Sequence, residues 1–450
     1  MHDLVGGMGK TFREWRIDQP WLLPPSVREL VPEGDPAHFV RDLVREELDL
    51  SAILGAYEEE RGFPPYHPVM MTALLLYALT QGVRSSRKIA RACETHVDFM
   101  ALTAMQRPDF RTVNAFRLRH LEALADLFGQ VLKLCQKAKL VKLGHVALDG
   151  TKLKANASKH KAMSYERMKK TEKQLKEEIA EWFKKADAED QEEDRLYGKD
   201  KRGDELPDWV ANKQKRVEKI REAKAELEAE AKAQLAAGVK PEPPDKPKGG
   251  KRSGKKLAPK ANGEPNDKAQ LNFTDSESKI LKGPDGFLQG YNGQAAVDSE
   301  KQIIVAQSLN NKQSDSLELP AMLTQIRERT GRNPKELSAD AGYLSEANLR
   351  ELKKRRINAY IATGQTHLNS ERKPRPLNGP LSKQMRTKLA RTRHRSRYRL
   401  RKQTVEPVFG QMKEARGMRR LLLRGLKKAR AEWAINCTAH NLAKLIKHST

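Results

Sequence analysis

The strongest hydrophobic pattern lies in the first third of the chain, where residues 36–140 predict helices. The segment that begins at His67 is apolar on every side from Val69 to Leu79. A helix without a polar face is typical of one buried inside a bundle. Gly82 predicts its end, because glycine readily adopts the left-handed conformation that closes a helix.

Two shorter helices with basic faces are predicted next. Ser85 and Ser86 predict an N-cap for one, and the other begins near Asp109. Short helices joined by tight turns are typical of a helix-turn-helix-like DNA-binding domain. The alternative is a plain helical bundle with a solvated basic surface. In the first interpretation the side chains that contact DNA are Arg87, Arg111, Asn114 and Arg117.

Residues 164–237 have apolar positions three and four residues apart, which predicts two helices in an antiparallel coiled-coil hairpin. The acidic segment from Asp187 to Asp208 predicts the loop between them. Residues 238–270 are rich in Pro, Gly and Lys and predict a flexible basic linker. The apolar positions are Tyr165, Met168, Leu175, Ile179 and Trp182, followed by Val210, Val217, Ile220, Leu227 and Ala231.

Strand patterns return near residue 286, after an earlier one that ends at Asp149. Two neighbouring strands are predicted first, then helices alternate with a strand that ends at Asp340 and a short strand over 359–362. Further helices are predicted from a cap at Thr404 and over 428–447. This order predicts an α/β fold, a mixed sheet flanked by helices. The predicted domains are 1–140 for the helical domain, 141–163 and 271–450 for the two parts of the sheet domain, and 164–237 for the hairpin insertion.

Composition points to a polyanion as the partner. The 450 residues contain 86 Lys and Arg against 59 Asp and Glu, a formal charge of +27. No apolar run approaches the roughly 20 residues of a membrane-spanning helix, and no signal-peptide pattern is present. The three cysteines lack metal-ligand spacing, which predicts buried, reduced thiols.

Three carboxylates occupy positions suited to divalent ions. Asp149 and Asp340 each end an apolar run, and Glu406 lies on an amphipathic segment beside the most basic stretch. Mg²⁺ and Mn²⁺ prefer carboxylate oxygens, and two such ions stabilise the transition state of phosphodiester cleavage. Any one of these residues alone would more often be structural. Together they predict a two-ion enzyme that cuts and joins DNA.

The basic residues near Glu406 predict contacts with DNA. Lys413 follows it by seven residues and would share its face on an unbroken α-helix. Upstream, an Arg-rich series surrounds Tyr398 and includes Arg399, Arg401 and Lys402. A solubilising surface is the alternative, although so many like charges repel unless a polyanion neutralises them. We expect mainly backbone contacts that tolerate different sequences.

Jointly, these motifs resemble the DDE transposases of bacterial insertion sequences, most closely the group called IS eleven-eighty-two, which is related to the IS-four and IS-five groups. The resemblance covers most of the chain. Its motifs are Tyr66-His67-Pro68, the segment 82–90, Leu148-Asp149-Gly150-Thr151-Lys152, Asn272-Phe273-Thr274-Asp275, Gly290-Tyr291-Asn292-Gly293-Gln294, Ala339-Asp340-Ala341-Gly342-Tyr343, the segment 405–413 and Ala439-His440-Asn441-Leu442.

The resemblance implies an RNase H-like catalytic domain in which Asp149, Asp340 and Glu406 bind the metal ions. It also implies that the N-terminal domain binds transposon ends and that the protein assembles as a homodimer or higher oligomer on DNA. Many relatives carry a Tyr-x2-Arg-x3-Glu-x6-Lys signature. Glu406 and Lys413 fit it, whereas Lys402 stands in the Arg position and Tyr398 is one residue further from the glutamate.

The leading interpretation is a transposase that acts on double-stranded DNA, namely the inverted repeats at insertion-sequence ends and a target. Such an enzyme would work in the bacterial cytoplasm, at the nucleoid. One alternative is a non-catalytic DNA-binding protein derived from a transposase. The other is a stand-alone RNase H-like endonuclease, which would cleave DNA without joining 3′-hydroxyl ends to a target.

Overall fold

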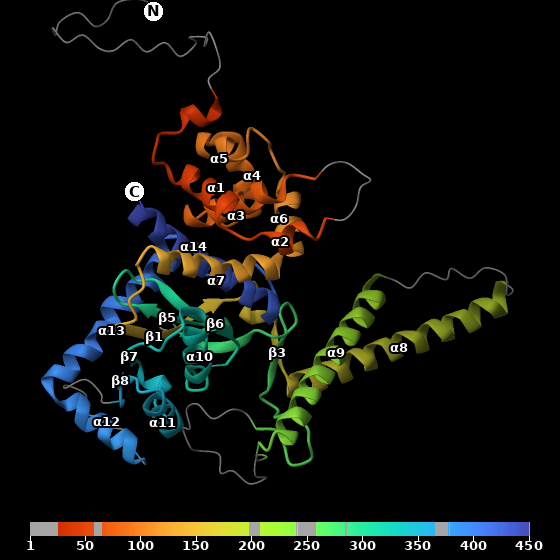
Figure 1. The fold of residues 1–450 in the computed structure, drawn as a ribbon. Coiled ribbons are helices and arrows are strands. Elements are labelled where there is room, and N and C mark those ends of the chain that lie inside the picture. The colour runs from red at the N-terminus through yellow and green to blue at the C-terminus, as the bar shows by residue number, and fades with distance from the viewer. Residues whose placement is uncertain are drawn as a thin grey trace, which may run out of the picture.

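The computed structural model describes a helical N-terminal region, a mixed sheet and two long helices that extend from the sheet (Figure 1). The described residues are 26–57, 65–197, 208–239, 241, 258–283, 286–312, 314–364, 377 and 379–449.

The N-terminal region confirms the prediction of short helices. It contains a 3-10 turn (Val27–Leu30) and α1 (Pro36–Glu46), α2 (Ser51–Leu54), α3 (Pro68–Thr80), α4 (Ser86–Thr95), α5 (Val97–Leu102), α6 (Phe110–Arg119) and α7 (Leu121–Lys137). Every residue of α3 from Met71 to Leu79 is buried, as its all-round apolar pattern predicts. Gly82 follows with a φ of +76°, and a Cβ there would lie 2.9 Å from the carbonyl oxygen of Ala415. Glycine is therefore required at this position by conformation and by space.

The sheet confirms the predicted order of strands and helices but contains one strand that the sequence analysis does not predict, Lys279–Gly283. Its strands are β1 (His145–Lys154), β4 (Lys279–Gly283), β5 (Gly286–Asp298), β6 (Ile304–Asn310), β7 (Glu336–Ala339) and β8 (Asn358–Ile361). They lie in the order β4-β5-β1-β7-β8, with β6 also paired to β5. The strands β1, β7 and β8 are parallel, and β4, β5 and β6 pair in antiparallel fashion. This mixed sheet is consistent with an RNase H-like domain.

Helices α10 (Leu319–Thr330), α11 (Glu346–Lys354) and α14 (Leu426–Ser449) pack around the sheet. Helix α14 contacts β6, α7 and α3, and one apolar core runs from the N-terminal helices into the sheet. Cys93, Cys135 and Cys437 are buried free thiols in this core, as predicted. None of the described helices has the length and apolar character needed to cross a membrane.

A buried ion pair joins the N-terminal region to α14. Arg84 Nη2 lies 2.8 Å from Glu432 Oε1, with side chains only 9% and 5% exposed. Arg84 also donates to the carbonyl oxygens of Gly417 and Arg420. The Glu432 carboxylate in turn accepts the backbone N–H groups of Leu422 and Leu423. Both charged groups thus make several hydrogen bonds, which lowers the cost of burying the ion pair, although Arg84 Nε has no partner among the described residues.

The two long helices, α8 (Tyr165–Tyr197) and α9 (Asp208–Ala236), run antiparallel. Tyr165 donates to Glu228 and Lys213 donates to Glu178, so the start of α8 meets the end of α9. Apolar side chains at the predicted positions fill the seam, with those of Trp182 and Val210 outside the described residues. The predicted loop from Asp187 is wrong as far as Tyr197, because the acidic segment contains good helix formers.

The prediction of a flexible linker over residues 238–270 is wrong for residues 258–270. Residues 240 and 242–257 lie outside the described residues, but residues 258–270 fold against the base of α8. The N–H groups of Tyr165 and Glu166 donate to the carbonyl oxygens of Ala269 and Asp267. At the same place β2 (Ala162–Ser164) pairs with β3 (Gln270–Asn272). These hydrogen bonds, rather than the local composition, determine the conformation here.

The helix that carries Glu406 begins earlier than predicted. Helix α13 (Thr392–Gly410) follows α12 (Pro380–Ala390), so Thr404 is not a cap and its hydroxyl donates to the carbonyl oxygen of Leu400. Pro407 lies inside the helix and has no N–H group to donate to the carbonyl oxygen of Gln403. The side-chain amide of Gln302 donates to that carbonyl oxygen instead, at 3.3 Å. This external donor explains how a proline is tolerated within α13.

Candidate active site

The sheet register brings Asp149 and Asp340 together. Asp149 lies inside β1 rather than at its end as predicted, because β5 continues to pair with β1 as far as Lys154. Pairing of β1 with β7, however, stops at Leu148 and Ala339. Asp149 and Asp340 are the next residues of these two parallel strands. Neighbouring strands lie about 4.8 Å apart, so the two carboxylates share one edge of the paired region.

A third carboxylate, Asp315, joins them from the turn between β6 and α10. A Cβ placed on Gly342 would lie 3.0 Å from Asp340 Oδ1 and 3.1 Å from Asp315 Oδ2. Both carboxylates therefore face the same small space, which a side chain at Gly342 would fill. No motif in the sequence marks Asp315, because it lies in a polar turn without periodicity.

Polar side chains of β5 hold Asp315 in place. Its Oδ1 accepts hydrogen bonds from Asn292 Nδ2 at 2.5 Å and Gln294 Nε2 at 2.6 Å, and Lys152 Nζ lies 3.6 Å away. Gln294 also accepts the hydroxyl of buried Tyr343. Alternate residues of a strand point to the same face, so Asn292 and Gln294 reach Asp315 together. Asn292 Oδ1 is buried and lacks a hydrogen-bond partner.

Burial and nearby negative charges make Asp149 and Asp340 hard to ionise. Burial, followed by the charges of Asp340 and Asp315, raises the pKa of Asp149 to about 6, although Arg401 opposes the shift. Burial and then Asp315 also raise the pKa of Asp340. Three carboxylates so placed need cations nearby when all are ionised.

Arg401 supplies such a cation. Its Nη1 bonds to Asp149 Oδ2 and its Nη2 lies 3.4 Å from Glu406 Oε1. The Arg401 side chain is 10% exposed, whereas that of Glu406 is 50% exposed. In this structure Arg401 therefore faces the carboxylates, and its contact with DNA stays a prediction. Glu406 contacts the aspartates through Arg401.

The residues provide suitable metal ligands, although not in a ready arrangement. Within the described part of the chain, no three acidic, His or Cys side chains are placed to bind one ion as they stand. Carboxylate and amide oxygens are nevertheless the donors that Mg²⁺ and Mn²⁺ prefer. The Arg401 guanidinium already places a positive charge between Asp149 and Glu406. The residues fit divalent ions if Arg401 withdraws.

The other residues near Glu406 that are predicted to contact DNA differ in exposure. Arg399 and Lys402 are exposed, and Tyr398 is half-buried with its ring 5.9 Å from the Arg401 guanidinium. Burial raises the pKa of Tyr398. Lys413 is half-buried in a π-helical turn, Gln411–Ala415, so it does not keep the phase of an unbroken α-helix.

Most of the predicted DNA contacts in the N-terminal region line one pocket. A cavity of about 500 Å³ lies between α4 and α6, with Asn114 in its lining. The guanidinium groups of Arg87 and Arg111 lie 5.2 and 5.7 Å from the ring of Phe110. Arg117, in contrast, is buried and donates to the carbonyl oxygen of Arg84. The prediction that Arg117 contacts DNA is wrong for this conformation, because its side chain lies in the interior.

Comparison with protein families gives two matches. Residues 269–442 match the family described as Transposase DDE domain, and residues 25–119 match Transposase domain (DUF772). The first segment contains Asp315, Asp340 and Glu406, whereas Asp149 lies between the two. No curated protein and no solved structure matches the chain. Two separate segments of the chain are thus similar to transposase domains, and the C-terminal one is similar to a DDE domain.

Proposed function

We propose that this protein binds the ends of an insertion sequence, cleaves them in a metal-dependent reaction and joins them to target DNA. The observation that carries the proposal is the meeting of Asp149, Asp315 and Asp340 at one edge of the sheet, with Glu406 beside them. We assign the sheet to the RNase H-like fold and retain IS eleven-eighty-two as the proposed group.

In this proposal the aspartates and Glu406 bind two Mg²⁺ or Mn²⁺ ions, which would activate the attacking oxygen and stabilise the leaving oxygen. Asn292 and Gln294 keep Asp315 oriented. Arg401, once released from the carboxylates, has a guanidinium fork that matches a DNA phosphate. Arg399, Lys402 and Lys413 would hold the backbone nearby.

DNA cleavage and joining assays test the proposal. A duplex that carries the inverted repeats flanking the gene is incubated with the protein, Mg²⁺ and a target plasmid. We expect 3′-hydroxyl strands cut at the repeat and joined to the target. Cleavage without joining would indicate a stand-alone nuclease, and binding without cleavage would indicate a non-catalytic DNA-binding protein. Either result would contradict the proposal.

The raised pKa of Asp149 predicts how metal binding depends on pH. Below about pH 6 the carboxyl is protonated, and a proton then competes with a divalent ion for its oxygens. We therefore expect the affinity for Mn²⁺ to increase as the pH rises from 5 to 7.5, measured by electron paramagnetic resonance of free Mn²⁺. Affinity that stays constant over this interval would contradict the participation of Asp149.

The remaining parts have proposed roles in binding and assembly. The pocket between α4 and α6 would contact transposon ends through Arg87, Arg111 and Asn114. We propose that α8 and α9 form a coiled-coil hairpin and that the protein assembles as a homodimer or higher oligomer on paired ends. Except for residues 258–270, which fold against α8, the proposed domain boundaries remain those predicted from the sequence, and the proposed location is the bacterial nucleoid.

A further inference from the structure

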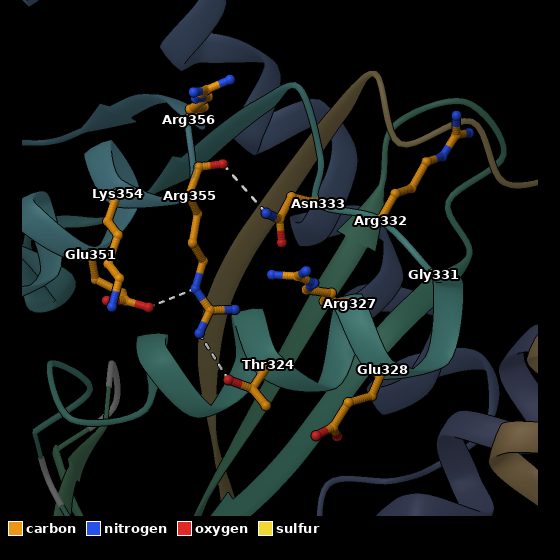
Figure 2. A pocket seen from close by; sticks show the side chains of 10 residues that line it. All are labelled: Thr324, Arg327, Glu328, Gly331, Arg332, Asn333, Glu351, Lys354, Arg355 and Arg356. Carbon is orange, nitrogen blue, oxygen red and sulfur yellow. Dashed lines mark hydrogen bonds and ion pairs between the residues drawn. The ribbon is translucent and has the colours of Figure 1, made fainter.

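A group of cations surrounds a pocket between α10 and α11 (Figure 2). We call it the basic pocket. Its volume is about 830 Å³. Its charged lining residues are Arg327, Arg332, Lys354, Arg355 and Arg356, opposed by Glu328 and Glu351.

Among the described residues, Arg355 is the cation of the pocket with the most internal contacts. Arg355 Nε lies 2.6 Å from Glu351 Oε1, and its Nη2 donates to the Thr324 hydroxyl at 2.9 Å. Among the described residues, this is the one ion pair within the pocket lining. Arg327, Lys354 and Arg356 are exposed cations, and Arg332 donates a hydrogen bond to the carbonyl oxygen of Lys142. The pocket thus has a surplus of positive charge.

Helix dipoles explain only part of this arrangement. Arg327 lies in the last turn of α10 and Lys354 in that of α11, where cations favour the helix C-terminus. Arg332 and Arg356 lie beyond the helix ends and gain little from the dipole, which falls off within one turn. The helix dipoles therefore do not explain why Arg332 and Arg356 line the same pocket as Arg327 and Lys354. This arrangement points to an anionic ligand.

The basic pocket and the carboxylates lie at opposite ends of β7. Arg332 and Asn333 precede this strand, whereas Asp340 follows it. Four residues of strand span roughly 13 Å, so a phosphate in the pocket cannot also lie at the aspartates.

We propose that the basic pocket binds backbone phosphates of a DNA segment other than the one presented to the carboxylates. Guanidinium groups bind phosphate oxygens through paired hydrogen bonds, and neutralisation by phosphates removes the repulsion among the cations. Four separate cations around an open pocket suit a row of phosphates better than a single small anion. The inference rests on DNA being the ligand of the protein, but not on metal binding or cleavage.

Charge reversal with a matched control tests the proposal. The double variant Arg327→Glu/Arg356→Glu is compared with Lys219→Glu/Lys232→Glu, which replaces exposed lysines of α9 and changes the net charge equally. Binding of a duplex without the repeats is measured at several salt concentrations, in the absence of divalent ions. We expect the pocket variant to lose about tenfold in affinity and about two units of salt slope, since each phosphate contact contributes roughly one. Equal losses in both variants would overturn the proposal, because bulk charge would then explain them.

A chemical probe distinguishes DNA from a small anion. The native cysteines are buried, so Lys354→Cys introduces one accessible thiol whose alkylation can be followed by mass spectrometry. We expect duplex DNA to protect this thiol and inorganic pyrophosphate to protect it weakly. Protection by pyrophosphate alone, or by neither, would overturn the proposal. Failure of DNA cleavage in the parent protein would contradict the proposed function without affecting either result.

Discussion

Replacing Asp149 with Asn should lower the rate of metal-dependent DNA cleavage about a thousandfold. Metal ions contribute several kcal/mol of transition-state stabilisation, and roughly 4 kcal/mol corresponds to this factor. Asn removes the charge that binds the ion while it keeps the shape of the side chain. Cleavage is measured under single-turnover conditions on end-repeat DNA with Mg²⁺.

The matched control for Asp149→Asn is Glu414→Gln. Glu414 is exposed, pairs with Arg419 at 2.7 Å and lies in the same basic region as Glu406. We expect this variant to cleave at the parental rate. Thermal unfolding of the Asp149→Asn variant tests whether it is folded. We expect an unchanged unfolding temperature, because Asn is close in shape to the protonated Asp149 side chain. Cleavage by folded Asp149→Asn at the rate of Glu414→Gln would contradict the assignment.

Replacing Glu432 with Ala should lower the free energy of unfolding by about 3–5 kcal/mol. The change leaves the buried charge of Arg84 without its carboxylate, and removing one partner of a buried ion pair has a cost of this size. It also removes the acceptor for the N–H groups of Leu422 and Leu423. Urea denaturation followed by circular dichroism measures the loss.

Glu122→Ala provides the control for this effect. Glu122 and Lys427 form an ion pair whose side chains are 68% and 82% exposed. An exposed pair contributes at most about 1 kcal/mol, so little change is expected. If Glu432→Ala were no more destabilising than Glu122→Ala, the buried pair would not stabilise the junction between the N-terminal region and α14.

This junction also connects the N-terminal region with the strand of Asp149. The segment bound by Arg84 continues to Leu421, whose N–H donates to the carbonyl oxygen of Lys154 in β1 at 2.8 Å. Lys154 N–H donates back to the segment, to the carbonyl oxygen of Arg419. A loss of Arg84 or Glu432 would therefore loosen the end of β1 as well as the helices.

The repeating patterns of the sequence were sufficient to predict most helices and strands. The stretch from Val69 to Leu79 is apolar throughout, and its helix, like the strands β5 and β6, is buried over most of its length. Apolar runs of this kind are a strong signal in a sequence. Asp340 directly follows a buried strand, and this position predicts it as a candidate metal ligand. Asp149 was identified for the same reason, although the continuation of β1 past it depends on β5, which lies far along the sequence.

Tertiary contacts determine the positions of Asp315 and Arg401, which local sequence patterns do not predict. The turn between β6 and α10 brings Asp315 close to the other aspartates. Hydrogen bonds from the side chains of Asn292 and Gln294 then hold its carboxylate in place. Arg401 was one basic residue among many, and its role depends on where α13 begins. Because the helix starts at Thr392, Arg401 falls on the buried stripe with Thr404, Val405 and Val408. Lys402 lies off this stripe and stays exposed.

The central claim, that the aspartates and Glu406 bind divalent ions in place of Arg401, is tested most directly by crystals grown with Mn²⁺. Anomalous scattering locates Mn²⁺ independently of the protein atoms. We expect two peaks, with Asp149, Asp315, Asp340 and Glu406 supplying ligands and the Arg401 guanidinium moved away from Asp149. Ordered Mn²⁺ elsewhere, or an Arg401–Asp149 pair that persists at saturating Mn²⁺, would contradict the account.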